Sequence, residues 1–157
     1  MDKQRILFIK FELLWWAVTF LIIGFVLYPI YKLQPVQFPF WKTNIIFVIV
    51  FVTVTRYIFF LKHTFLGYIQ WLKVLVILIC IPLLFYLVEK LHFFKDYMDK
   101  IGLEDKFEHL SLQGQTDIIN YIDSEMIFFG VGSLISSVIL PFRMLISFWR
   151  THNRGTI

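Results

Sequence analysis

The run of residues 126–142, MIFFGVGSLISSVILPF, contains seventeen consecutive residues without an ionisable side chain. Three comparable apolar runs precede it, at residues 13–31, 44–55 and 74–88. The hydrocarbon core of a bilayer takes roughly 17–25 apolar residues per helix. A soluble domain of 157 residues has no interior large enough to hide four such runs. The sequence therefore predicts an all-α, polytopic integral membrane protein with four transmembrane helices.

The composition supports a lipid environment for most of the chain. Hydrophobic residues make up 59% of it and charged residues only 17%, against a hydrophobic share of roughly 45–50% in soluble domains. We expect one domain over residues 1–157, with spans at about 11–31, 44–61, 72–88 and 126–146 and an extramembrane segment at 89–125.

The distribution of charge predicts the topology. If four spans alternate, one side receives nine Lys and Arg residues and two acidic residues, and the other receives six basic and nine acidic residues. Basic residues are retained on the cytoplasmic side of a membrane. We therefore expect a multi-pass protein of the bacterial inner (cytoplasmic) membrane with both termini in the cytoplasm.

The first connection, residues 32–42, contains two prolines and three large aromatic residues. Pro35 and Pro39 predict a stiff, extended turn. Aromatic side chains are enriched at the boundary between lipid and water, so Phe38, Phe40 and Trp41 are expected there.

The segment 89–125 shows an amphipathic pattern. Apolar residues recur at spacings of three and four, which indicates a helix that continues the third span outward until Gly102 ends it. A second helix would then start near Thr116 and continue into the fourth span. We predict an amphipathic helical hairpin, which either lies on the headgroup region or docks a partner. The side chains expected to face that partner are Leu91, Phe94, Met98, Ile101, Asp117, Tyr121 and Glu125.

Four ionisable residues are expected at membrane depth near one surface, namely Glu12, Arg56, Lys73 and Arg143. A charge in a span costs about 2.5–3.5 kcal/mol at the helix centre on insertion scales, so such residues are usually paired or reach the interface. Three interpretations are open. The first is that the side chains extend to anionic headgroups of the bilayer, the second that Glu12 pairs with Arg56 or Arg143, and the third that the residues form a functional site.

The fourth span carries small residues at helical spacing, which are Gly130, Gly132, Ser133, Ser136 and Ser137. Small residues allow helix backbones to approach closely. They predict a helix-packing seam, either within the bundle or in self-association or contact with another membrane protein subunit.

Several chemistries have no sequence signature here. The four histidines lie outside the apolar runs, and Cys80 is the only cysteine. No two of these residues have metal-binding spacing, and no nucleophile-elbow, H-E-x-x-H or P-loop pattern occurs. We therefore expect no catalytic residue, no cofactor and no metal ion. The basic residues flank the spans, which argues against nucleic-acid binding.

The function that fits these observations is a non-catalytic accessory or assembly subunit of a larger membrane protein complex. The alternative is a small oligomeric transporter or channel that uses Glu12 and Arg56 or Arg143 in its path. A lipid-modifying membrane enzyme is the third hypothesis.

Overall fold

The computed structural model describes residues 3–33, 38–61 and 64–153, and the regular secondary structure in these ranges is entirely helical. Four helices are long and two elements are short. In chain order they are α1 (Lys3–Lys32), α2 (Trp41–Phe60), α3 (Phe65–Tyr68), α4 (Gln70–Lys100), the 3₁₀ helix η2 (Glu104–Lys106) and α5 (Leu112–Asn153). The predicted spans fall one on each long helix. The all-α fold class is therefore confirmed.

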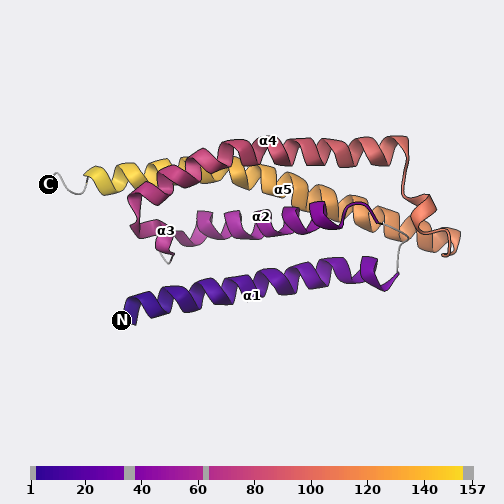
Figure 1. Cartoon of the computed structure of the whole chain (residues 1–157), viewed down its shortest axis with the longest axis horizontal. Helices are drawn as coiled ribbons and strands as arrows, with labels where there is room; N and C mark the ends of the chain where they lie inside the picture. The colour runs from indigo at the N-terminus through magenta and orange to yellow at the C-terminus, as the bar shows by residue number, and fades with distance from the viewer. Residues whose placement is uncertain (1–2, 34–37, 62–63, 154–157) are drawn as a thin grey trace.

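The long helices lie side by side and alternate in direction (Figure 1). Both termini lie at one end of the bundle, called here the terminal end, together with α3. The α1–α2 and α4–α5 connections lie at the opposite end, called here the far end. An even number of alternating spans requires this arrangement.

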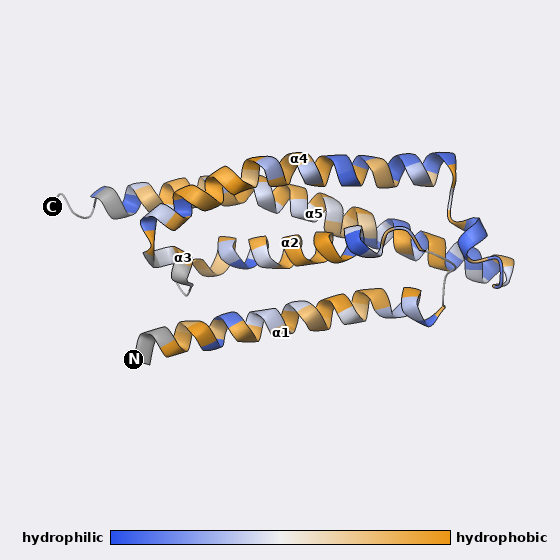
Figure 2. Cartoon of the chain, viewed as in Figure 1, coloured by the Kyte–Doolittle hydropathy of each residue, from blue (hydrophilic) through white to orange (hydrophobic). Residues whose placement is uncertain are grey.

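Each long helix is long and apolar enough to cross a membrane, over Ile6–Lys32, Trp41–Phe60, Gln70–Lys100 and Leu112–Arg150. The hydrophobic residues dominate the middle of the bundle, and hydrophilic residues gather in the α4–α5 connection (Figure 2). Large apolar side chains point outward from three helices, as Phe25, Phe85 and Phe128 illustrate. Because lipid is the solvent that accepts such faces, the structure indicates a multi-pass membrane protein.

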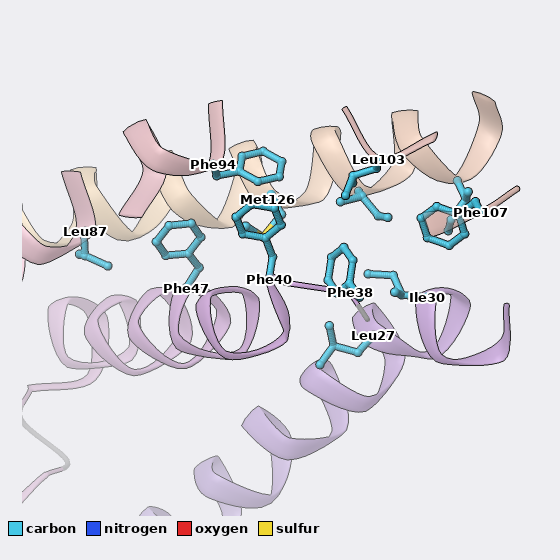
Figure 3. Close-up of a cluster of buried hydrophobic side chains, with 12 residues drawn as sticks. Leu27, Ile30, Phe38, Phe40, Phe47, Leu87, Phe94, Leu103, Phe107 and Met126 are labelled. Carbon is cyan, nitrogen blue, oxygen red and sulfur yellow. The ribbon is translucent and has the colours of Figure 1, made fainter. Parts of the chain in front are cut away.

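Helix α5 is the centre of the bundle. Both α2 and α4 pack along it extensively, whereas α1 has far fewer contacts with α2 and α5. The largest buried cluster lies toward the far end (Figure 3). Its members are Leu27, Ile30, Phe38, Phe40, Phe47, Leu87, Phe94, Leu103, Phe107, Ile118, Ile122 and Met126.

The structure does not show the expected amphipathic hairpin as a separate unit between the third and fourth spans. The continuation of the third span as a helix that ends at Gly102 is confirmed. Helix α4 continues without a break to Lys100, and α5 already begins at Leu112. Gly102, at φ +78°, ends α4 and donates its backbone N–H to the carbonyl of Tyr97 at 3.0 Å. The start expected near Thr116 is wrong, because its hydroxyl donates to the carbonyl of Leu112 at 3.0 Å within α5.

The length of α4 follows from the direction of its apolar stripe. Leu91, Phe94 and Met98 lie on the face of α4 that packs against the large buried cluster, and this packing stabilises the helix up to Lys100. Leu103 and Phe107 of the connection are fully buried in the same cluster. The segment between α4 and α5 therefore packs on the bundle.

Candidate functional site

The four ionisable residues expected at membrane depth all lie toward the terminal end, one on each long helix. Glu12 belongs to α1, Arg56 to α2, Lys73 to α4 and Arg143 to α5. Their hydrogen bonds do not join them into one cluster. Three of these bonds link three different pairs of helices, and the bond from Lys73 to Gln70 lies within α4.

Arg56 and Glu12 form an ion pair between α2 and α1, in which the guanidinium donates to the Glu12 carboxylate. The Arg56 side chain is 3% exposed and that of Glu12 is 20% exposed. The guanidinium also lies over the Tyr57 ring, 4.5 Å from its centroid, an arrangement in which the ring quadrupole attracts the cation. Pairing offsets the cost of placing each charge at membrane depth. Arg56 therefore fastens the peripheral helix α1 to the bundle.

Lys73 is fully buried near the start of α4. Its ammonium donates to Ser147 Oγ of α5 at 3.0 Å and to Gln70 Oε1 at 3.3 Å. Both acceptors are neutral. The Ser147 contact crosses from α4 to α5, so the lysine contributes to the packing of these two helices at the terminal end.

Arg143 donates from Nε to the backbone carbonyl of Ile58 at 3.3 Å. Ile58 lies in the last turn of α2, where carbonyl groups lack an intrahelical partner and the helix dipole favours a cation. The contact therefore joins α5 to the end of α2 and satisfies a backbone acceptor.

The small-residue seam of α5 faces the other helices of the bundle. A Cβ on Gly130 would lie 2.8 Å from Leu91 Cδ1 of α4 and 3.1 Å from Phe47 Cε2 of α2. A Cβ on Gly132 would meet the Phe51 ring of α2 at 2.8 Å. These glycines thus permit the close approach of α2 and α4 to α5.

The serines of the seam are buried but bond within their own helix. Ser133 donates to the Gly130 carbonyl at 2.7 Å, and Ser136 donates to the Ser133 carbonyl at 3.1 Å. Ser137 is also fully buried. The hydroxyl groups of Ser133 and Ser136 therefore add no bond across the helix contacts.

The outer residues of α5 that share one face differ in environment. Asp117 is exposed and accepts from Gln113 at 3.0 Å. Tyr121 donates its hydroxyl to the Val26 carbonyl of α1 at 2.8 Å, and Glu125 is buried against α2. On α4, Leu91, Phe94 and Met98 pack inward, while Ile101 is 63% exposed.

The sequence interpretation missed Asn44, which is fully buried in the first turns of α2 and donates from Nδ2 to Glu125 Oε1. A signal was present, since Asn44 is a polar residue at the start of an otherwise apolar run. Nothing in the sequence, however, joins it to a carboxylate 81 positions later.

A shallow apolar groove of about 510 Å³ opens on the surface between α1 and the outer part of α5. Its lining is aromatic and aliphatic apart from one glycine and one proline. The lining residues are Phe20, Leu21, Gly24, Phe25, Tyr28, Pro29 and Tyr121. A Cβ added at Gly24 would meet no atom within 4 Å, so this glycine leaves open space at the helix surface.

Comparison with protein-family models, curated proteins and solved structures found no match to this chain. Within residues 3–33, 38–61 and 64–153, no group of three or more His, Cys, Asp or Glu side chains is arranged to hold a metal ion. The site must therefore be interpreted from its own geometry, which includes internal polar contacts between helices and an open apolar groove.

Proposed function

We propose that this chain is a non-catalytic accessory or assembly subunit of a larger membrane protein complex, and that its groove beside α1 receives a transmembrane helix of an unlike partner. The observation that carries this proposal is the groove. It lies on the long helix that has the fewest contacts within the bundle, and its lining is almost entirely apolar.

The shape of the groove supports a helix as the occupant. Gly24 leaves room for another backbone to approach α1, as small residues do at helix contacts in membranes, while Phe20 and Phe25 supply large flanking surfaces. The bond from Tyr121 to the Val26 carbonyl links α5 to α1 beside the groove. Because this bond positions the two helices before any partner arrives, docking would require little ordering.

The charged residues support a structural role in the same way. Glu12 and Arg56 are bonded to each other, and Arg143 is bonded to a helix carbonyl. In these contacts the charged side chains hold neighbouring helices together. The alternative, a transporter with Glu12 and Arg56 or Arg143 in its path, would have to break these contacts during each cycle.

We further propose that the terminal end of the bundle faces the cytoplasm of a bacterium. The support is the excess of Lys and Arg on that side and the excess of acidic residues on the other. The neighbouring anionic headgroups would then lie close to the basic residues at the helix ends.

Site-specific photo-crosslinking in native membranes tests the docking proposal. A photoreactive phenylalanine analogue at Phe25, inside the groove, should give one discrete adduct with an unlike membrane protein. The matched control is Phe85 on α4, which is 75% exposed and lies outside the groove; it should react with lipid only. Gly24→Leu should remove most of the Phe25 adduct by filling the groove, whereas Ala17→Leu, at an exposed position outside the groove, should leave it intact.

Two results would reject the proposal. Lipid adducts alone at Phe25, as at Phe85, would show that the groove is an ordinary lipid-facing surface. An adduct with a second copy of this chain would show self-association in place of an unlike partner.

A further inference from the structure

The buried contact between Glu125 and Asn44 leaves two acceptor atoms without a partner. Glu125 on α5 is 8% exposed and Asn44 on α2 is fully buried. The amide Nδ2 of Asn44 donates to Oε1 of Glu125. The remaining oxygen of each group, Oδ1 of Asn44 and Oε2 of Glu125, is also buried and has no hydrogen-bond partner among the described residues.

The surroundings of this contact are apolar. Phe47 lies one turn from Asn44 on α2, and Ile122 and Met126 lie beside Glu125 on α5; all three belong to the large buried cluster. Leu91 and Phe94 cover the same cluster from α4. A carboxylate that enters such surroundings without a cation loses its hydration and gains little in return.

The charged and titratable groups on the neighbouring elements are engaged elsewhere. On α5, the Tyr121 hydroxyl donates to the Val26 carbonyl of α1, and Asp123 pairs with Lys95 of α4 at 3.3 Å. Lys90 of α4 pairs with Glu89 at 3.3 Å. Lys42 near the start of α2 is exposed. None of the ion pairs formed by described residues includes Glu125.

The chemistry of the two groups supplies a solution. An ionised carboxylate only accepts hydrogen bonds, whereas a carboxylic acid has one O–H donor. A proton on Oε2 would let Glu125 donate to Oδ1 of Asn44 while Oε1 continues to accept from Nδ2. Both orphaned oxygens would then be satisfied in one cyclic acid–amide pair.

We propose that Glu125 and Asn44 form a proton-binding site within the bundle, in which Glu125 is a neutral carboxylic acid bonded twice to the Asn44 amide. The proton comes from hydronium in the surrounding water: an O–H bond forms at Oε2, one O–H bond of hydronium breaks, and a water molecule is released. The pair fastens α2 to α5 at the far end, in the way that Arg56 and Glu12 fasten α1 to α2 at the terminal end.

The site makes the stability of the protein depend on pH in a defined direction. The folded protein holds a proton that a glutamate of the unfolded chain releases above about pH 4.3. Because the folded state then binds more protons than the unfolded state, the free energy of unfolding contributed by this site falls as pH rises.

Infrared spectroscopy of the purified full-length protein in lipid tests the site directly. At neutral pH, the wild-type protein should show a carboxylic acid C=O band that shifts when the glutamate carboxyls are labelled with ¹³C and disappears in Glu125→Gln. Glu108→Gln, at an exposed position, is the matched control and should keep the band.

Thermal unfolding gives a second measurement. In Glu125→Gln, the glutamine amide can form two hydrogen bonds with the Asn44 amide without an added proton, so this variant should fold. Its Tm should depend less on pH than the Tm of the wild-type protein, whereas Glu108→Gln should keep the wild-type pH dependence. If Glu125→Gln fails to fold, the labelled band of the wild-type protein decides alone. The absence of that band at neutral pH would overturn the proposal, as would a Tm that rises with Na⁺ and shows no change with pH, because a metal cation would then occupy the site. These outcomes are independent of whether a partner docks beside α1.

Discussion

Replacing Arg56 with leucine should lower the free energy of unfolding by about 3–5 kcal/mol, which is the usual effect of removing one member of a buried ion pair. The change would leave the Glu12 carboxylate at membrane depth without the guanidinium to which it is bonded. Helix α1 should be most affected, because it has few other contacts with the bundle. Denaturation of the purified protein in mild detergent measures the loss.

The double variant Glu12→Leu, Arg56→Leu distinguishes the effect of an unpaired charge from the effect of replacing the side chain at position 56. Replacement of both charges by apolar side chains removes the unpaired charge, so the double variant should regain most of the stability that the single variant loses. If Arg56→Leu alone is as stable as the wild-type protein, Arg56 must reach the headgroups and the ion pair contributes nothing.

Truncating Phe40 to alanine should cost about 3–5 kcal/mol, as is typical when a buried phenylalanine leaves a cavity. The Phe40 side chain is 1% exposed and lies at the far end, just before α2. Its ring packs edge-on against Phe94 and Tyr97 of α4, with centroid distances of 5.1 Å in both cases. Such pairs add about 0.5–1.5 kcal/mol each to the effect of burial. The loss should separate the α1–α2 connection from α4.

Phe85→Ala is the matched control for this prediction, because Phe85 lies on α4 like Phe94 but is 75% exposed. It should change stability by less than about 0.5 kcal/mol, as is usual for surface substitutions. Limited proteolysis can localise the effect, since Phe40→Ala should expose the far-end connections to cleavage and Phe85→Ala should not. Equal losses in the two variants would contradict the role assigned to Phe40.

The sequence was sufficient to predict the four long helices, because a run such as residues 126–142 has no charged residue that would favour water. It was not sufficient to predict what the extension of the third span packs against. The stripe of Leu91, Phe94 and Met98 is consistent with lipid, a partner or the bundle itself, since periodicity reports a face and not what covers it. The pattern therefore predicted the continuation of the third span up to Gly102, but it could not predict that this continuation packs on the bundle.

The connection before α2 shows the same limit. Its aromatic residues were expected at the lipid boundary, yet Phe38 and Phe40 are buried in the large cluster, and Trp41 packs partly against it. The two prolines suggested a stiff turn, and Pro35 lies outside the described residues. Composition indicates that such side chains prefer to leave water, but it does not distinguish the membrane from a protein interior.

The candidate site was predictable only in part. The order of the spans places Glu12, Arg56, Lys73 and Arg143 toward one end, and the sequence offered both Arg56 and Arg143 as partners for Glu12. The rotation of each helix about its axis selects Arg56, and hydropathy does not report this rotation. Asn44 and Glu125 were not paired in advance because each alone resembles a residue at the boundary of a span.

Labelling of introduced cysteines in sealed membrane vesicles tests the central claim, that four helices cross the bilayer and place the termini on the side opposite to the α4–α5 connection. Cys80 is the only cysteine, so Cys80→Ser provides a background without thiols. In right-side-out vesicles, a membrane-impermeant maleimide should label Asp105→Cys at once, Asn153→Cys only after permeabilisation, and Phe85→Cys in neither case. Labelling of Asp105→Cys and Asn153→Cys from the same side would contradict the four-span arrangement.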